Sequence, residues 1–117
     1  MDKAAVQAQI EAFQAWLQHR WPGSVVTVEV PIEADRPDGT RLRGRIDLLV
    51  DTPDGWVLID HKANPGGASR DEALSQQYGP QLSSYAEAIE ACSGKRVKEL
   101  WLFLPVAARA VRVEMIA

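Results

Sequence analysis

The chain has 117 residues, enough for one domain that buries about two-thirds of its unfolded surface. Hydrophobic residues make up 46% and charged residues 25% of the composition, as is usual for a globular protein. The net charge of −3 excludes a generally basic surface, so a polyanionic partner would have to bind a local basic patch.

Two further classes of protein are excluded by composition. Cys92 is the only cysteine, which leaves no disulfide framework and no cysteine-ligated zinc or iron–sulfur site within the chain. We interpret it as a small apolar residue on a helix. Charged side chains interrupt the N-terminal stretch, so we expect no signal peptide, no membrane span and a cytoplasmic location.

The first half of the chain predicts one helix and three strands. Apolar residues between positions 3 and 20 recur at helical spacing: Val6, Ile10, Phe13 and Leu17. Trp21-Pro22-Gly23 ends that helix. Two similar Pro-Asp-Gly turns, at 36–40 and 52–56, then predict an antiparallel meander with strands at 25–34, 41–51 and 56–62.

The second half predicts a helix that follows a loop at 64–70. Helical spacing resumes near Asp71, and we expect a break at Gly79-Pro80, because proline suits a first helical position. The main helix would then run from Pro80 to Ala91 or Cys92, with Gly94 as its C-terminal stop.

Two further strands complete the predicted domain. Residues 97–104 predict a strongly apolar, central strand, and residues 110–116 predict an edge strand. The element order αβββαββ indicates an α/β fold, with a mixed sheet and helices packed against it. No linker or repeat divides the chain, so we expect a single domain over residues 1–117.

Two acidic residues and a lysine belong to neighbouring predicted strands. The hairpin places Asp47 opposite Asp60, and the two-residue step to Lys62 keeps Asp60 and Lys62 on one face. Two carboxylates about 4 Å apart repel by roughly 4 kcal/mol at an effective dielectric of 20, so the pair needs a cation, a shared proton or a basic partner. Such oxygen ligands suit Mg²⁺ or Mn²⁺, and the main-chain carbonyl of His61 is positioned as a third ligand.

This arrangement suggests hydrolysis of a phosphodiester by a metal-activated water. Lys62 would orient that water or stabilise the transition state. Simpler interpretations of the single motifs remain open. Asp60 and Lys62 would also suit a strand-end ion pair, and the segment from Gly44 to Asp47 would suit a bulge followed by a capping carboxylate.

Three motifs together resemble a known family: Gly44-Arg-Ile-Asp47-Leu-Leu, Leu58-Ile-Asp60-His-Lys62 and Gln81-Leu-Ser-Ser-Tyr85. They resemble the RecB-type branch of the PD-(D/E)XK nuclease superfamily, above all the C-terminal nuclease domains of RecB and AddA helicase–nucleases. The resemblance runs from about Val28 to Val113. It implies a restriction-endonuclease-like αβββαβ core, built from a three-stranded meander, a crossover helix and one or two further strands.

Carried over to this sequence, the resemblance implies that Asp47 and Asp60 are metal ligands and that Lys62 is the catalytic lysine. It implies that Gln81 and Tyr85, one turn apart on a helix, brace the active site and the DNA phosphate. Tyr85 is equally compatible with a place in the core between helix and sheet.

The resemblance also implies a metal ligand that these motifs do not supply. RecB-type members take a further His from a position well upstream of the meander, so we expect a nuclease core without the upstream family helix. Glu11 is the acidic candidate on the first helix, although a solvated glutamate is the simpler interpretation. His19 is interpreted as structural or exposed, and Ala63 stands where the family usually has a small hydroxyl residue.

DNA binding would depend on a local positive field. Arginines crowd the first turn and the strand after it: Arg36, Arg41, Arg43 and Arg45. Arg43 and Arg45 alternate with Asp47, so we expect them on its face, where they would reach phosphates beside the metal. Long side chains that cover an exposed sheet face are an equal alternative. A weaker basic cluster comprises Lys95, Arg96 and Lys98.

The sequence therefore predicts a Mg²⁺- or Mn²⁺-dependent deoxyribonuclease of the RecB/AddA type, an exonuclease rather than an endonuclease. Its expected partners are the DNA backbone, bound without sequence preference, and a helicase domain or subunit in DNA end processing and recombinational repair. One alternative is a catalytically incomplete module that binds DNA or docks a subunit. Another is a structural fragment that a larger polypeptide completes.

Overall fold

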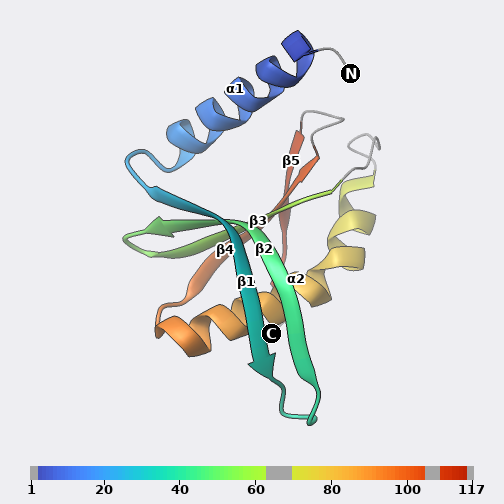
Figure 1. Cartoon of the computed structure of the whole chain (residues 1–117). Coiled ribbons are helices and arrows are strands. Elements are labelled where there is room, and N and C mark those ends of the chain that lie inside the picture. Colours follow the sequence, from blue (N-terminus) through green and yellow to red (C-terminus); the bar gives the residue numbers. More distant parts are fainter. Residues whose placement is uncertain (1–2, 63–69, 105–108, 116–117) are drawn as a thin grey trace.

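The computed structural model describes residues 3–62, 70–104 and 109–115. Its elements follow the predicted order αβββαββ (Figure 1). They are α1 (Lys3–Arg20), β1 (Val25–Asp35), β2 (Arg41–Thr52), β3 (Gly55–His61), α2 (Asp71–Ser93), β4 (Val97–Leu104) and β5 (Arg109–Val113). The last strand ends earlier than predicted. Apart from Arg70, the expected loop at 64–70 lies outside the described residues, as does Ala63.

The strands form one mixed five-stranded sheet in the order β1-β2-β3-β4-β5. The first three make the predicted antiparallel meander, β4 runs parallel to β3, and β5 returns antiparallel to β4. A parallel pair needs a crossover connection, and α2 lies within the connection between β3 and β4. The fold is the mixed α/β architecture that the sequence predicted.

A separate apolar core lies on each face of the sheet. The α2-side core includes Leu58, Leu82, Tyr85 and Leu100. The α1-side core includes Leu17, Trp21, Val57, Ile59 and Trp101. Because strand side chains alternate, the continuous apolar run of β3 supplies both cores. Among the described residues, no helix is long and apolar enough to span a membrane.

The helix α2 is continuous through Pro80, so the predicted break at Gly79-Pro80 is wrong. Figure 1 shows that α2 instead changes direction along its length. Proline lacks the N–H that bonds one turn back and its ring crowds that carbonyl, which bends a helix without necessarily ending it. Burial of Leu74 before the proline and of Leu82 after it keeps both segments on the sheet.

The predicted turns and the predicted helix stop are confirmed. In the first turn, the Asp38 carboxylate accepts a hydrogen bond from the Thr40 N–H (2.9 Å). In the second, the buried Thr52 hydroxyl donates to the Gly55 carbonyl (2.6 Å). The residue after α2 is Gly94, whose φ of 71° is the left-handed conformation that glycine adopts without steric cost.

The alternation of β2 side chains changes at Asp47. Ile46 and Leu49 both lie in the α2-side core, although residues three apart in a regular strand face opposite sides. Leu48 lies in the α1-side core. Glu29 and Asp47 fall between the register pairs Val28–Leu48 and Val30–Ile46, and the φ of Glu29 is 52°, in the left-handed region. This distortion accompanies the turn of Asp47 toward the α2 side.

We predict that Glu29→Gly stabilises the fold by up to about 1 kcal/mol, because glycine avoids the steric cost of a positive φ. The matched control is Thr27→Gly on the same strand, where glycine should destabilise by roughly 0.5–1 kcal/mol. Urea unfolding measures both free energies. Equal destabilisation by the two substitutions would show that the conformation of Glu29 stores no strain.

Candidate active site

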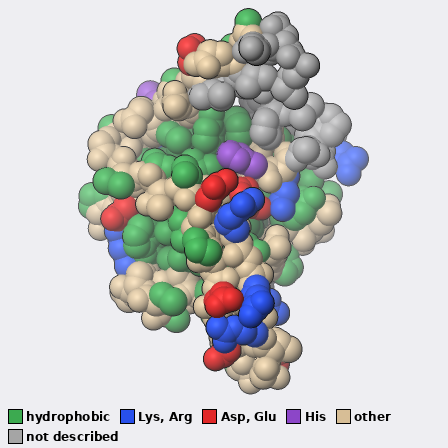
Figure 2. All heavy atoms as spheres, viewed as in Figure 1, with side chains coloured by type: hydrophobic (Ala, Val, Ile, Leu, Met, Phe, Trp, Pro, Cys, Tyr) green, Lys and Arg blue, Asp and Glu red, His purple; other side chains and the backbone are tan. Residues whose placement is uncertain are grey.

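Asp47, Asp60 and Lys62 lie together where the end of β3 meets the middle of β2. Leu48 pairs with Ile59, so the register sets Asp47 opposite Asp60. The Lys62 ammonium lies 3.0 Å from an Asp60 carboxylate oxygen. Figure 2 shows acidic, basic and histidine side chains grouped near the middle of the viewed face, with hydrophobic side chains around them. The structure therefore brings together the three residues that the motifs singled out.

Two side chains fix the position of Lys62. One is Asp60, and the other is Tyr78 of α2, whose ring centroid lies 4.8 Å from the ammonium nitrogen. These two contacts hold the ammonium group in place. The Lys62 side chain is still 26% exposed, so a ligand can reach its charge. The motifs did not single out Tyr78. Its place two helical turns before Tyr85 on the same face of α2 was the available signal.

The main chain of His61 faces Asp47. Its N–H donates a hydrogen bond to Asp47 Oδ2 (2.8 Å). In an antiparallel ladder the N–H and the C=O of one residue point to the same neighbour, so the His61 carbonyl is also directed toward the β2 side. The His61 ring lies on the opposite face of the sheet from Asp60, against Phe13 and Phe103.

The two carboxylates have pKa values displaced in opposite directions. Burial and the hydrogen bond with Asp47 raise the pKa of Asp60 from 3.8 to about 6, while Lys62 opposes the rise. Burial also acts to raise the pKa of Asp47, but the hydrogen bond with Asp60, the His61 N–H and the charge of Arg45 outweigh it and lower that pKa. The pair thus shares one proton more readily than two isolated aspartates would.

Tyr85 lies in the α2-side core, the alternative that the sequence left open, and is 6% exposed. Its ring packs so closely on Gly44 that a Cβ at that position would overlap the tyrosine hydroxyl. The Gln81 side-chain amide donates to the same hydroxyl (3.3 Å). The motif glycine and the helix motif therefore contact each other. Their role in bracing DNA stays a prediction.

Two arginines of β2 meet acidic partners on β1. Arg41 pairs with Asp35 (2.9 Å) and with Glu33 (3.2 Å). Arg43 also pairs with Glu33 (3.2 Å). The cross-strand register, which the turn sets, places these acids opposite the arginines. Two of the four arginines of the predicted positive field on this hairpin are therefore neutralised.

Arg45 differs from its neighbours because it makes no ion pair within the part of the chain that the structure describes. Gly44 and Ile46 face α2, so Arg43 and Arg45 lie on the other face of β2 from Asp60. The expectation that they share a face with Asp47 does not hold, because the alternation changes at Asp47. Arg45 is nevertheless near enough to lower the pKa of Asp47.

Among the residues that the structure describes, no third acidic side chain joins the pair. Glu11 is exposed on α1 and accepts a hydrogen bond from the Gln7 amide (3.2 Å). His19 is exposed near the C-terminal end of α1. Within the described ranges, no three His, Cys, Asp or Glu side chains come close enough to hold one metal ion. The metal ligands that the described residues can supply here are therefore the carboxylates of Asp47 and Asp60 and the main-chain carbonyl of His61.

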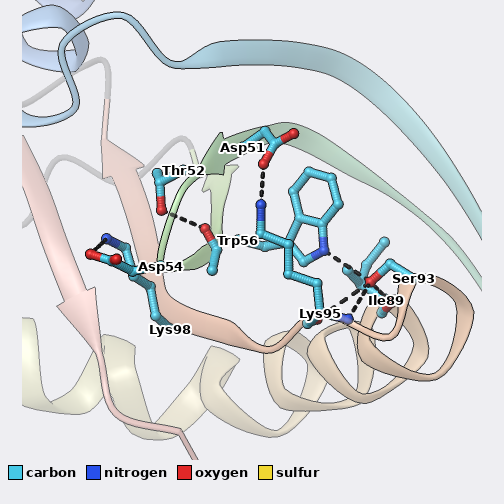
Figure 3. A network of polar contacts seen from close by, with 9 residues as sticks. Asp51, Thr52, Asp54, Trp56, Ile89, Ser93, Lys95 and Lys98 are labelled. Carbon is cyan, nitrogen blue, oxygen red and sulfur yellow. Dashed lines mark hydrogen bonds and ion pairs between the residues drawn. The ribbon is translucent and has the colours of Figure 1, made fainter.

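Two lysines of the second predicted basic cluster, Lys95 and Lys98, pair with the β2–β3 hairpin (Figure 3). This hairpin lies at the opposite end of β3 from Asp60. Lys95 pairs with Asp51 and lies over the Trp56 ring, 4.7 Å from its centroid. The Lys98 ammonium lies 3.9 Å from Asp54. Lys95 follows α2 and Lys98 belongs to β4, so these lysines tie the hairpin to the connection between α2 and β4, remote from the carboxylate pair.

Comparison with known proteins agrees with this arrangement. A family model described as the PD-(D/E)XK nuclease superfamily matches residues 1–116. The chain belongs to this superfamily. The sequence Asp60-His61-Lys62 fits the (D/E)XK pattern in the superfamily name.

Relatives of this PD-(D/E)XK domain are named as one of the subunits of an ATP-dependent helicase/nuclease. The chain is 37% identical over 93 residues to the protein of Desulforudis audaxviator, a match that covers 76% of this chain and 8% of that protein. It is 41% identical over 63 residues to the Pelotomaculum thermopropionicum protein, over 54% of this chain and 5% of that protein. The chain therefore spans less than a tenth of the length of these relatives.

We predict that Asp60→Asn stabilises the metal-free protein above about pH 6, by roughly 1–3 kcal/mol, because asparagine lacks the buried charge. The folded pKa of Asp60 lies above its unfolded value of 3.8, so the contribution of this group to wild-type stability is lost as the pH rises from 3.8 to about 6. Below this window the two proteins should be equally stable. Urea unfolding in EDTA across these pH values measures the difference. A variant less stable than wild type at about pH 7.5 would identify a structural ion pair with Lys62.

We predict that Gly44→Ala destabilises the fold by roughly 1–3 kcal/mol, because the new methyl group displaces the Tyr85 ring. In a Tyr85→Ala background the same substitution should cost less than about 0.5 kcal/mol, since the collision is gone. A double-mutant cycle by chemical denaturation gives both values. Equal costs in the two backgrounds would show that Gly44 is needed for some reason other than Tyr85.

Proposed function

We propose that the chain is the nuclease domain of a helicase–nuclease and that it hydrolyses DNA phosphodiesters with a divalent metal ion. The convergence of Asp47, Asp60 and Lys62 carries this proposal. Two adjacent carboxylates and a lysine held 3.0 Å from one of them form a constellation that serves phosphate chemistry and gives little to the core.

The carboxylate pair fits Mg²⁺ or Mn²⁺. Burial and Asp47 both oppose the charge of Asp60, and a cation shared by the two carboxylates removes that cost. Magnesium is usually bound by one or two carboxylates and fills its other positions with water and phosphate oxygens. Asp47, Asp60 and the His61 carbonyl therefore suffice as protein ligands. The bound ion would supply positive charge that acidifies water and neutralises the phosphate.

Lys62 acts on the phosphate as a fixed point charge. Asp60 and the Tyr78 ring hold its ammonium beside the carboxylates, so it need not reorganise when negative charge develops in the transition state. The same ammonium can donate a hydrogen bond to the attacking water. The chain itself thus contributes positioning and a preorganised charge.

The names of the relatives support a role for this domain beside a helicase. Their name joins a nuclease to an ATP-dependent helicase, and this chain matches only a small part of each. We infer that a helicase domain or subunit is its partner, and that it acts as an exonuclease in DNA end processing and recombinational repair. The helicase would deliver the strand to the carboxylate pair.

A catalytically incomplete module is the second candidate, and one observation favours it. No third acidic or histidine side chain joins Asp47 and Asp60 in the ranges the structure covers. The same surface would then bind DNA or dock a subunit without cleaving it. Metal binding separates the candidates, since Mn²⁺ should raise the Tm of wild type but not that of Asp60→Asn if the site is complete.

We predict that the purified chain cleaves linear DNA with Mg²⁺ or Mn²⁺ and that Lys62→Ala lowers the rate at least about a hundredfold, because the fixed charge is lost. The matched control is Lys98→Ala, a lysine paired with Asp54 far from the site, which should retain activity. Circular dichroism checks that both variants fold.

Equal activity in wild type and Lys62→Ala would contradict the assignment of the catalytic lysine. Absence of cleavage by every version, together with no Mn²⁺-dependent rise in Tm, would favour the incomplete module.

A further inference from the structure

Three aromatic rings cluster on the α1 side of the sheet at the end of β3, on the opposite face from the Asp60 side chain. Phe13 of α1 and Phe103 of β4 have ring centroids 4.2 Å apart. The His61 ring of β3 lies 5.6 Å from each of them, edge-to-face in both cases. The cluster therefore joins one helix and two interior strands at the end of β3.

The exposure of this aromatic cluster differs from that of the core. His61 is exposed, and Phe13 and Phe103 are half-buried. The residue two positions before His61, Ile59, is fully buried in the α1-side core. Packing of α1 on the sheet accounts for the two phenylalanines, but not for a histidine ring that is left open beside them.

His61 connects the aromatic cluster to the site of cleavage. Its N–H holds the Asp47 carboxylate at 2.8 Å, while its ring belongs to the cluster. Its neighbours Asp60 and Lys62 project to the other face of the sheet. A strand whose phosphate lies at Asp47 and Asp60 would have to pass round the end of β3 for the adjoining base to reach the His61 ring, and the His61 main chain is the point where the two faces meet.

Arg45 supports a nucleic-acid occupant. It is exposed, lies on the same side of the sheet as His61, and makes no ion pair among the residues that the structure describes. It is also close enough to Asp47 to affect its pKa. Aromatic rings next to a cationic side chain are the combination that single-stranded DNA grooves use for base and backbone.

We propose that Phe13, His61 and Phe103 form a stacking site for an unpaired nucleobase of single-stranded DNA, next to the phosphate that is cleaved. This inference rests on the proposed nuclease function and gives it a substrate class. Stacking uses the π-face that every base has, so the site tolerates any sequence. A base inside a duplex is already stacked and paired, so the site favours single strands.

The test compares two oligonucleotides of about 15 nucleotides, a length that covers one single-strand binding site. One is oligothymidylate, and the other has the same phosphates with abasic sugars throughout. Fluorescence anisotropy in EDTA and low salt measures both affinities without cleavage. We expect wild type to bind oligothymidylate roughly fivefold to a hundredfold more tightly than the abasic strand.

The variants isolate the aromatic ring of His61. His61→Ala should reduce this preference to less than about threefold, and His61→Phe should retain it, because stacking needs a ring and not a histidine. Phe103→Leu, which keeps the apolar volume, should weaken the preference as well. The matched control is His19→Ala, the other exposed histidine, near the far end of α1, which should bind as wild type does. Thermal unfolding confirms that each variant is folded.

Equal affinity of wild type for the two strands, including no measurable binding of either, overturns the stacking site. So does an unchanged preference in His61→Ala. The cleavage assay keeps the two proposals distinguishable. DNA cleavage without a preference for bases would leave the nuclease function standing and remove the stacking site. A base preference in a chain that never cleaves DNA would support base binding by the three rings and contradict the nuclease function.

Discussion

The juxtaposition of Asp47 and Asp60 is the constraint on which the site depends. Two like charges on adjacent strands are unfavourable, and Asp60 is also buried. The fold offsets the cost with the His61 N–H on one carboxylate and the Lys62 ammonium on the other. Both groups come from the end of β3 and the residue directly after it, so the segment that carries Asp60 also carries the groups that hold the pair. Because the two carboxylates repel each other, the metal-free site favours the binding of a cation or a proton.

Features set by local chemistry were predictable from the sequence. The two Pro-Asp-Gly turns fix a meander because proline, aspartate and glycine each favour a turn conformation, and Gly94 ends α2 for the same kind of reason. Pro80 was misjudged because its local effect, loss of one hydrogen bond, is outweighed by burial on both sides of it. Whether a helix continues through a proline depends on tertiary packing, which cannot be read from the neighbouring sequence.

The candidate site was predictable in its acids and its lysine, since the period of a strand and the length of a turn bring them together. What surrounds them was not. The pairing of Arg43 with Glu33 depends on a register between segments ten residues apart (43 − 33), and the place of Tyr78 beneath Lys62 depends on how α2 crosses the sheet. Whether Arg45 and Asp47 share a face of β2 depends on one irregular residue, Glu29, on the neighbouring strand. These are properties of three-dimensional packing.

The left-handed backbone of Glu29 also bears on how copies of the domain meet. β1 is an edge strand of the described sheet, and its Val25 and Val28 are 67% and 62% exposed. A long, flat edge with apolar side chains is a template on which another chain can add a strand. Because the backbone leaves the extended conformation at Glu29, an incoming strand loses its register directly after Val28. The irregularity that accompanies the turn of the Asp47 carboxylate thus also discourages edge-to-edge aggregation.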